Sequence, residues 1–355
     1  MLRNKTGGTY TFCFLSNSGI GSSFLPRAHS VPEPIDLSII IVNWRSADFL
    51  QKCLASIYAN TVGINFEIVV VDNASFDGSA EMVKLEFPAV SFVQSDKNVG
   101  FSGANNLGYA RAHGRNLLFL NPDTEVTGPA LTTMMGFLDS MPSVGIVGAR
   151  LLNSDLTVQT SCVQRFPSIF GQLFDSDLLR KLFPKCSLWG TRALLEPHNA
   201  PVSVEMVSGA CLMIRRTIFE QVGQFNTDYF MYAEDVDLCF RVHNIGWKNC
   251  YVEEAVVIHH GGKSTASKPV SHFSAILMRE SLLRFVRSTR GEWYAAVYQA
   301  ATALNAVLRL FILGLALVLT FGQYHPRSVR NAFGKWSRVF RWSIGLEGWA
   351  RNPSA

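Results

Sequence analysis

The feature that most constrains this chain is an alternation of strand-like and helix-like segments that begins near residue 37. Residues 38–42 read Ser-Ile-Ile-Ile-Val, a β-branched run typical of a strand that is covered on both faces. Residues 47–59 then carry apolar side chains at helical spacing, and residues 66–71 form a second strand-like run. A strand, a helix and a strand within about 35 residues predict a βαβ unit with two parallel strands.

The same alternation continues along the chain. The further elements that we predict are a helix opening at residues 77–79, a strand at 90–93, a helix at 105–112, strands at 117–120 and 207–214, a helix at 234–245 and a strand at 249–258. Between residues 145 and 205 the alternation weakens, and we predict irregular structure there. This order indicates an α/β fold with a Rossmann-like, doubly wound, mostly parallel sheet, whose ligands bind beyond the carboxyl ends of the strands.

A first polar cluster follows the strand-like run at residues 66–71. Asp72 comes directly after Ile-Val-Val-Val, where a carboxylate without a partner is costly. At this edge of a sheet it can accept a hydrogen bond from a nucleotide base, a ribose hydroxyl or a backbone amide. For Asp77, which precedes a helix, we favour capping of that helix.

A loop rich in glycine and asparagine covers residues 98–108. Asn98, Gly100 and Asn105 belong to it. Such residues let the backbone approach a ligand closely and offer amide donors and acceptors to a neutral group such as a base or a sugar. The glycine spacing differs from that of the dinucleotide fingerprint, and a glycine loop that only precedes a helix is an equally good interpretation.

A third cluster, Asn121-Pro122-Asp123, follows the apolar run at residues 117–120. Asp123 is expected at the carboxyl edge of the sheet, where a hard divalent cation can bridge a carboxylate to a diphosphate. The alternative is a turn with no ligand, which Asn-Pro-Asp also favours.

A fourth cluster combines the acids Glu234, Asp235 and Asp237 with His259 and His260. A carboxylate near the start of a helix can deprotonate a hydroxyl that lies within hydrogen-bond reach. The helix dipole also favours acids there without any catalytic role. An imidazole at the end of a strand can hold a metal ion, although paired histidines are more often structural.

The excess positive charge of the chain lies at its C-terminal end. The net charge is +5, and residues 327–355 alone contain six basic side chains and one acidic one. This distribution argues against a nucleic-acid partner, which requires cations spread over a binding face.

An apolar stretch at residues 300–321 precedes this basic segment and is long enough to span a bilayer, although Arg309 within it is costly there. A helix expected from about residue 327 has one basic and one apolar side. We therefore expect residues 291–355 to form a membrane-associating helical tail, with a helix hairpin packed on the main domain as the alternative.

The N-terminal segment and the cysteines bear on the cellular compartment. Residues 1–35 lack an apolar core of signal-peptide length, so we expect a flexible leader that is not an export signal. The seven cysteines are scattered with no Cys-x-x-Cys pair, which favours reduced thiols in the cytosol over a disulfide scaffold or a zinc site.

Taken in order, the motifs of residues 36–290 resemble family 2 glycosyltransferases of the GT-A fold, and within them the bacterial rhamnosyltransferase-like branch. The motifs that carry the resemblance are Ile-Ile-Val-Asn-Trp, Val-Val-Asp-Asn-Ala-Ser-x-Asp-Gly-Ser, Asn-x-Gly-Phe-Ser-x-Ala-Asn-Asn-x-Gly, Leu-Asn-Pro-Asp, Val-Ser-Gly-Ala, Met-Tyr-x-Glu-Asp-Val-Asp-Leu and His-His-Gly-Gly-x-Ser.

The resemblance implies roles for the catalytic and metal residues. Asp235 would be the general base that activates an acceptor hydroxyl for an inverting displacement, with Glu234 in support. Asp123 would bind Mg²⁺ or Mn²⁺ at the donor diphosphate, with His259 as a further ligand. The commoner family motif is Asp-x-Asp, so Asn121 in the first position leaves this site one charge short.

The resemblance also implies a nucleotide-sugar donor, with dTDP-rhamnose first and UDP-sugars next. The residues that it assigns to donor binding are Asn43, Asp72, Asn98, Gly100, Asn105 and Asn121. The acceptor would be a hydroxyl of a lipid-linked or cell-envelope glycan, and the enzyme would act at the cytoplasmic face of a bacterial cell membrane, as a peripheral or single-span protein.

Two other functions fit the same fold. A processive polysaccharide synthase would bring several spanning helices and a Gln-x-x-Arg-Trp segment, whereas this chain has one hydrophobic tract. A non-catalytic nucleotide-binding protein would be indifferent to replacement of Asp235 by asparagine.

Overall fold

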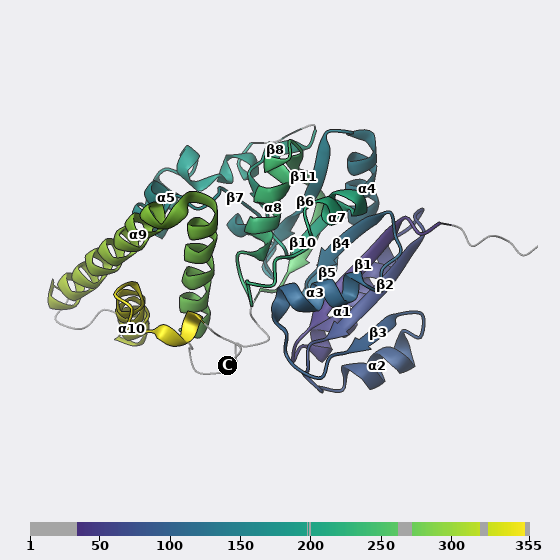
Figure 1. Ribbon diagram of the computed structural model, residues 1–355, viewed down its shortest axis with the longest axis horizontal. Helices are drawn as coiled ribbons and strands as arrows, with labels where there is room; N and C mark the ends of the chain where they lie inside the picture. The colour runs from purple at the N-terminus through teal and green to yellow at the C-terminus, as the bar shows by residue number, and fades with distance from the viewer. Residues whose placement is uncertain (1–33, 197, 199, 262–271, 320–325, 352–355) are drawn as a thin grey trace, which may run out of the picture. The chain divides into compact units, whose positions relative to one another are not determined.

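The computed structural model describes residues 34–196, 198, 200–261, 272–319 and 326–351 (Figure 1). The predicted leader lies outside the described residues except for its last two, and so do Gly262, Lys263 and Ser264 of the histidine motif. The chain from Pro34 onward forms one compact unit.

The predicted α/β architecture is confirmed. The first elements are β1 (Leu37–Asn43), α1 (Ala47–Asn60), β2 (Phe66–Asp72), α2 (Ser79–Glu86) and β3 (Ser91–Gln94). β1 runs parallel to β2 on one side and, on the other, to β4 (Asn116–Leu120). All seven residues of β1 are buried, as its β-branched run predicts for a central strand.

The next helices and strands are α3 (Gly100–Tyr109), β5 (Thr124–Val126) and α4 (Ala130–Ser140). The helix predicted at 105–112 thus begins five residues earlier than expected. Gly100 has φ +77, a left-handed conformation that starts the helix at the end of the glycine loop. Asn105 therefore lies within a helix and not in a loop.

The prediction of irregular structure from residue 145 is wrong for β6 (Val144–Leu152), a buried strand inside the sheet. The sheet order is β3-β2-β1-β4-β10-β6-β11-β5, where β10 is Cys211–Arg215 and β11 is Lys248–His259. Two glycines hide this strand in the sequence. Gly148 faces Val207, where a Cβ would come within 2.4 Å of the valine Cβ, so packing requires glycine in a strand that propensity alone would not predict.

Short elements link β6 to the second half of the sheet. They are η1 (Thr160–Cys162), β7 (Val163–Gln164), α5 (Ile169–Leu173), α6 (Asp177–Leu182), η2 (Ser187–Trp189), η3 (Thr191–Leu194), β8 (Val202–Val204), β9 (Met206–Val207) and α7 (Arg216–Gln221). The single strand predicted at 207–214 is divided into β9 and β10 by a turn at residues 208–210. This turn lies at the edge of the sheet where the predicted site residues gather.

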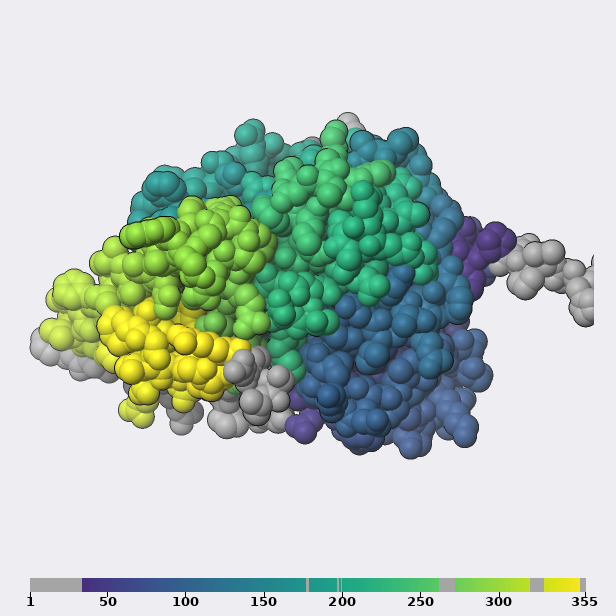
Figure 2. All heavy atoms as spheres, in the orientation of Figure 1, coloured from purple at the N-terminus to yellow at the C-terminus, as the bar shows by residue number. Residues whose placement is uncertain are grey.

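The C-terminal part is helical, with α8 (Glu234–Asn244), α9 (Phe273–Leu319), α10 (Pro326–Ser343) and η5 (Gly348–Arg351). α9 consists of two helices joined at Gly291, whose φ of +85 and ψ of 171 break the helical path. Its first half packs in the core through Ile276, Phe285 and Val286, which are fully buried. α10 lies against α9 (Figure 2).

Candidate active site

A cavity of about 310 Å³ opens at the carboxyl edge of the sheet. Six of the ten residues predicted for the site line it, namely Asn98, Gly100, Asn121, Glu234, Asp235 and His259. They come from four segments that are far apart in the sequence. Asp123 is not among the lining residues, but its carboxylate lies 3.3 Å from His259 Nε2.

Asn43 and Asp72 lie side by side at the ends of β1 and β2, in register with each other. Both side chains are fully buried, and Asn43 Nδ2 donates to Asp72 Oδ1 at 2.9 Å. Asp72 also accepts hydrogen bonds from Gln94 and from the Ser75 and Phe76 backbone amides. Burial raises the pKa of Asp72, but hydrogen bonds from Ser75, Gln94, Phe76 and Asn43 outweigh burial and hold it below its usual range.

Asp77 bonds the start of the predicted helix and of a second one, since its carboxylate accepts the backbone N–H of Ser79, the first residue of α2, at 3.3 Å. The same carboxylate accepts the backbone N–H of Ala47, the first residue of α1, at 3.1 Å. It also accepts from Asn43 Nδ2. The polar cluster at residues 72–79 thus fixes the loop after β2 to the loop after β1.

The glycine loop is tied to the segment before α8. The backbone N–H of Phe101 donates to the Phe230 carbonyl at 2.7 Å, and a Cβ on Gly100 would lie only 2.3 Å from that oxygen. Asn105, by contrast, bonds back to Phe101 within α3 and is not among the residues that line the cavity. Gly100 therefore serves a close approach between two segments of the site.

A second group of site residues joins Asn121, Asp123 and His259. His259 Nε2 lies 3.3 Å from Asp123 Oδ1 and 3.4 Å from Asn121 Nδ2. The other ring nitrogen, Nδ1, lies 2.9 Å from Gln159 Oε1, whose carboxamide can only accept there. The proton of a neutral His259 is therefore on Nδ1, and Nε2 directs a lone pair toward Asp123 and Asn121.

These donors fit a divalent cation. Asn121 Oδ1 is buried and has no hydrogen-bond partner, so it can serve as an oxygen ligand. One carboxylate, one amide oxygen and one imidazole suit Mg²⁺ or Mn²⁺. Across the described residues, no three side chains of His, Cys, Asp or Glu are grouped so that they could hold a metal ion.

The adjacent His260 is structural. Its Nε2 lies 2.7 Å from Glu125 Oε1 and its Nδ1 2.8 Å from Ser154 Oγ. Its backbone N–H donates to the Asp123 carbonyl at 2.9 Å. His260 thus holds the end of β11 against the turn that carries Asp123.

The acidic pair Glu234–Asp235 begins α8 on the other side of the cavity. Tyr232 and Ala233 precede it with φ of 68 and 64, two consecutive left-handed non-glycine residues. Such a conformation costs about 1–2 kcal/mol per residue and occurs where the surrounding structure imposes it. The turn presents both carboxyl groups to the cavity.

The two acids have different surroundings. Asp235 Oδ2 accepts the Gly209 N–H and Oδ1 its neighbouring Val236 N–H, both at 2.8 Å, whereas Glu234 Oε2 is buried with no partner. Burial and then the charge of Asp235 raise the pKa of Glu234 to about 8, and burial raises the pKa of Asp235. The third acid, Asp237, pairs with Arg241 at 2.8 Å and is structural.

Several residues of the site were not predicted. Gln159 and Gly209 orient His259 and Asp235, and Asn73 binds Asn98 through its side chain. Asn73 stands beside Asp72 in a recognised motif, so its position was a usable signal. Gln159 offered none, because it is 100 residues from its partner and sits in a segment without periodicity.

A profile of the family described as "Glycosyl transferase family 2" matches residues 38–223, a little over half of the chain. The chain belongs to glycosyl transferase family 2. The predicted family is thereby confirmed, and the matched range contains Asn98, Gly100 and Asn121 of the cavity but ends before α8 and His259.

Two similar family members are rhamnosyltransferases. The N-acetylglucosaminyl-diphospho-decaprenol L-rhamnosyltransferase of Mycobacterium tuberculosis is 29% identical over 274 residues, which are 73% of this chain and 87% of the relative. The rhamnosyltransferase WbbL of Escherichia coli K12 is 26% identical over 242 residues, 65% of this chain and 86% of the relative.

Among solved structures, the chain is similar to the mannosyltransferase PcManGT of Pyrobaculum calidifontis in complex with GDP-Man and Mn²⁺. The TM-score is 0.53 with 17% identity, and the match covers 89% of this chain and 88% of that one. At this identity the likeness shows the fold, which is GT-A as predicted.

Proposed function

We propose that the protein is an inverting, metal-assisted glycosyltransferase that moves one sugar from a nucleotide diphosphate to a hydroxyl group of a lipid-linked or cell-envelope glycan. The observation that carries this proposal is that one cavity is lined by Asn121 and His259 on one side and by Glu234 and Asp235 on the other. A cation site and a carboxylate base are the two groups that transfer between a diphosphate and an alcohol requires.

In this mechanism Asp235 takes the proton of the acceptor hydroxyl. The oxygen then bonds to the anomeric carbon of the donor while the bond from that carbon to the diphosphate oxygen breaks. The raised pKa of Asp235 favours its role as a proton acceptor. Glu234, which burial keeps protonated near neutral pH, adds no second negative charge beside the base and can donate a hydrogen bond to the acceptor.

Asp123 and His259, with the Asn121 oxygen, are the residues that would hold Mg²⁺ or Mn²⁺. A divalent cation there supplies charge stabilisation to the departing nucleoside diphosphate. The chain itself contributes the orientation of the ligands, because Gln159 fixes the His259 ring.

For the donor side we propose the segments that contain Asn43, Asp72, Asn98 and Gly100. Asn43 and Asp72 are buried, so their contribution is to hold the loop at residues 73–77, while Asn98 and Gly100 border the cavity. dTDP-rhamnose is the first donor to test, because both rhamnosyltransferase relatives align over most of their length.

The acceptor and location follow from the same relatives and from the C-terminal helices. We propose residues 36–290 as the glycosyltransferase domain and residues 291–355 as a membrane-associating tail, at the cytoplasmic face of a bacterial cell membrane. Within the part of the chain that the structure describes, Phe273–Leu319 is the helix whose length and composition would allow it to cross a bilayer.

The experiment measures transfer of sugar from dTDP-rhamnose and a panel of UDP-sugars to a polyprenyl-diphosphate-linked glycan, with Mn²⁺. Asp235→Asn should lower transfer by about 10²–10⁴-fold with donor binding unchanged by calorimetry. Asp228→Asn, an exposed acid on the preceding loop, is the matched control and should keep wild-type transfer. Full activity of Asp235→Asn, or retention of anomeric configuration in the product, would refute the mechanism.

A further inference from the structure

The second half of α9 leaves a row of apolar side chains in solvent. They recur every three to seven residues along one side of the helix, and they are Trp293, Val297, Leu304, Leu308, Phe311, Leu315 and Val318. Trp293 is 88% exposed and Phe311 68%. We call this row the apolar face of α9. Scattered exposed hydrophobic residues are ordinary, whereas a row along an entire helix marks an interaction surface.

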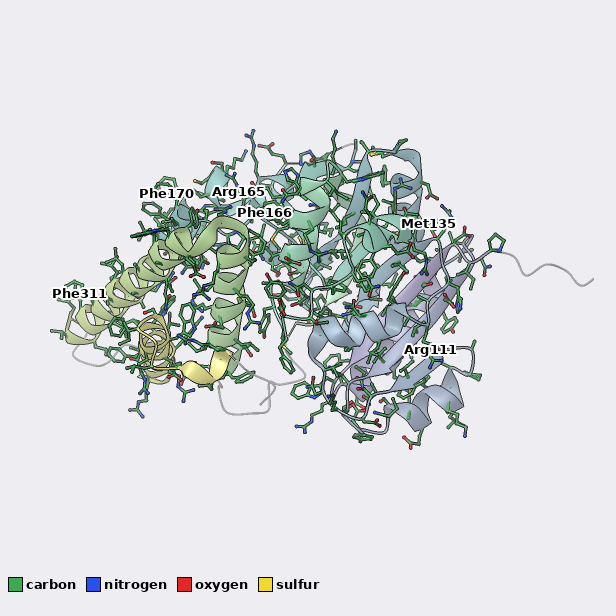
Figure 3. The ribbon with its side chains drawn as sticks, viewed as in Figure 1. Arg111, Met135, Arg165, Phe166, Phe170 and Phe311 are labelled. Atoms are coloured by element: carbon green, nitrogen blue, oxygen red, sulfur yellow. The ribbon has the colours of Figure 1, made fainter. Side chains whose placement is uncertain are left out.

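The segment packed against this half of α9 is also apolar on its outside. Phe170 and Phe174 at α5 are 65% and 44% exposed, and Leu182 and Phe183 at α6 are 61% and 60% exposed. α5 is fastened to α9, since Tyr294 Oη accepts the Ile169 N–H at 3.3 Å. Figure 3 shows Phe170 and Phe311 directed outward at the same side of the view.

The opposite face of the same half of α9 is polar and bonded to protein. Asn305 Nδ2 donates to the carbonyl oxygens of Gln172 and Leu173, each at 2.9 Å. Arg309 donates to the Asp175 carbonyl and lies 4.2 Å from the centre of the Trp336 ring. Arg309, which the sequence places inside an apolar window, therefore has its partners in Asn305, in the link between α5 and α6, and in α10.

This arrangement is incompatible with a helix that crosses a bilayer. A spanning α9 would either leave Asn305 and Arg309 unpaired in hydrocarbon or carry the short helix α5, which supplies the carbonyl partners of Asn305, into the membrane with it. A helix that lies in the plane of one leaflet keeps these bonds and still buries its apolar face.

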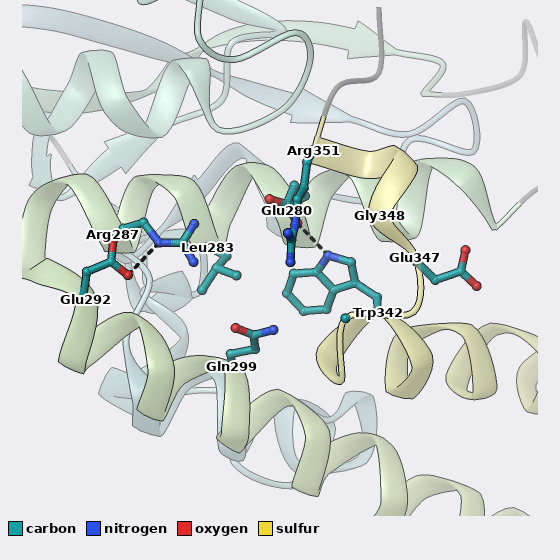
Figure 4. A pocket seen from close by; sticks show the side chains of 10 residues that line it. Glu280, Leu283, Arg287, Glu292, Gln299, Trp342, Glu347, Gly348 and Arg351 are labelled. Carbon is teal, nitrogen blue, oxygen red and sulfur yellow. Dashed lines mark hydrogen bonds and ion pairs between the residues drawn. The ribbon is translucent and has the colours of Figure 1, made fainter. Parts of the chain in front are cut away.

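Most of the apolar side of α10 is covered by protein, although Phe333 is 42% exposed. Trp336, Val339 and Trp342 are buried against α9, and Trp342 Nε1 donates to Glu280 Oε2 at 2.8 Å beside a polar cavity of about 380 Å³ (Figure 4). The exposed side of α10 carries Arg330, Arg338 and Arg341. The amphipathic helix predicted from the sequence exists, but its apolar half packs on α9.

The charge of these helices indicates the kind of membrane. Residues 272–351 contain eleven basic and only three acidic side chains. Near an anionic surface each cation contributes about 1 kcal/mol of attraction. A protein partner would not require such an excess beside a row of aliphatic and aromatic side chains.

We propose that the apolar face of α9, together with the outer side chains of α5 and α6, lies in the plane of one leaflet of an anionic bilayer, so that α9 does not cross it. The inference rests on the proposed function in two respects, the cytoplasmic side of the membrane and the lipid-linked acceptor. In this proposal the membrane contact is not made by α10. It is made by a surface that α9 and the α5–α6 segment form together.

The first test measures binding of the full chain to vesicles of phosphatidylglycerol and phosphatidylcholine without substrate. Leu308→Asp with Phe311→Asp should weaken binding at least about tenfold, since both charges would enter the apolar region of the leaflet. Val62→Asp with Leu85→Asp, apolar residues on the sheet domain that are more exposed still, is the matched control and should bind as wild type. Phe170→Asp with Phe174→Asp should weaken binding as well.

Three results of this test would overturn the proposal. Vesicle binding that survives both pairs of aspartates excludes the surface. Equal binding to neutral and anionic vesicles excludes the anionic membrane. Conversion of a wild-type dimer to a monomer by Leu308→Asp with Phe311→Asp, seen by light scattering, would assign the surface to a second copy of the chain.

The second test decides between an in-plane and a spanning helix. Arg338→Cys on α10 should react with an impermeant maleimide only after spheroplasts are permeabilised, because an in-plane α9 keeps α10 on the cytoplasmic side. Reaction in intact spheroplasts would show a spanning α9, and the unsubstituted chain gives the background from native thiols.

Sugar-transfer assays distinguish a failure of the proposed function from a failure of the membrane surface. Leu308→Asp with Phe311→Asp should still transfer sugar to a water-soluble acceptor analogue while losing transfer to an acceptor in vesicles. Wild-type membrane binding without any transfer would refute the proposed function and leave the surface assignment standing.

Discussion

Gln159 and His259 hold each other by two hydrogen bonds. Gln159 Oε1 lies 2.9 Å from His259 Nδ1, and Gln159 Nε2 donates to the His259 carbonyl at 2.6 Å. The first bond sets the tautomer of the imidazole and the second fixes the backbone at the end of β11. Together they direct His259 Nε2 toward Asp123.

Replacing Gln159 by leucine should therefore weaken metal binding. The leucine cannot accept the Nδ1 proton, so the ring is free to turn and to change tautomer. We expect the affinity for Mn²⁺, measured by calorimetry with the free protein, to fall about 10–100-fold. Gln164→Leu, a residue of the following strand β7 whose side chain bonds only the Ser161 carbonyl, should leave the affinity unchanged. Equal affinity in both variants would show that Gln159 has no part in the metal site.

Glu234 makes stability depend on pH. Its pKa is about 8 in the folded protein, against 4.5 for an ordinary glutamate, so between these values the folded chain keeps a proton that the unfolded chain releases. The stability associated with this group is complete below pH 4.5 and is lost as the pH rises through 8.

Glu234→Gln should remove this loss, because an amide does not ionise. We expect the free energy of unfolding of the variant to exceed that of wild type by about 4–5 kcal/mol at pH 8.5, with a much smaller difference at pH 4.5. Urea unfolding at the two pH values measures it. Glu81→Gln on the surface of α2 serves as the control, and a wild type that gains stability toward pH 8.5 relative to Glu234→Gln would contradict the assignment.

The destabilisation expected from a side chain at Gly100 has two sources, the left-handed backbone conformation and a steric clash with the Phe230 carbonyl. Its φ is +77, and a Cβ would come within 2.3 Å of the Phe230 carbonyl, whereas Gly63 has φ +80 with nothing within 4 Å. Gly63→Ala should lower the free energy of unfolding by about 1 kcal/mol, because only the left-handed conformation opposes the new side chain. Gly100→Ala should cost about 2–4 kcal/mol, because the backbone of the site must also move.

Denaturant unfolding of the two variants and of wild type gives both numbers. Gly100→Ala should in addition raise the KM for the donor, because α3 and the Phe230 segment separate. Equal losses of stability in the two variants would mean that the Phe230 segment adapts freely and does not define the cavity.

The sequence predicted those parts of the molecule whose local pattern and tertiary surroundings agree. β1 is a continuous β-branched run at the centre of the sheet, and parallel pairing with β2 places Asn43 beside Asp72 as the motif implies. β6 was missed because Gly145 and Gly148 are required by close packing, and a glycine carries no signal of the side chain that it faces.

The sequence likewise predicted some residues of the site and missed others. The residues that bear charge or an amide stood out at the ends of strands, and most of them reach the cavity. Asn105 does not, because a one-dimensional pattern could not show that α3 starts at Gly100 and turns this side chain inward. Gln159 and Gly209 act through geometry between distant segments, which no spacing along the chain expresses.

Gly209 provides the last prediction, since it positions Asp235. Its N–H donates to Asp235 Oδ2 at 2.8 Å, and a Cβ would lie 3.2 Å from the Asp235 Cβ and 3.4 Å from Oδ2. Gly209→Ala therefore has to displace the carboxylate by a few tenths of an ångström. Because alignment of the base matters at this scale, we expect kcat to fall about tenfold with the KM for the donor unchanged. The longer hydrogen bond from the N–H of residue 209 should also raise the pKa seen in the kcat profile, because that hydrogen bond stabilises the charged carboxylate.

Gly136→Ala in α4, where nothing lies within 4 Å, is the matched control and should leave kcat and its pH profile unaltered. A Gly209→Ala enzyme with wild-type kcat and pH profile would show that Asp235 needs no backbone support.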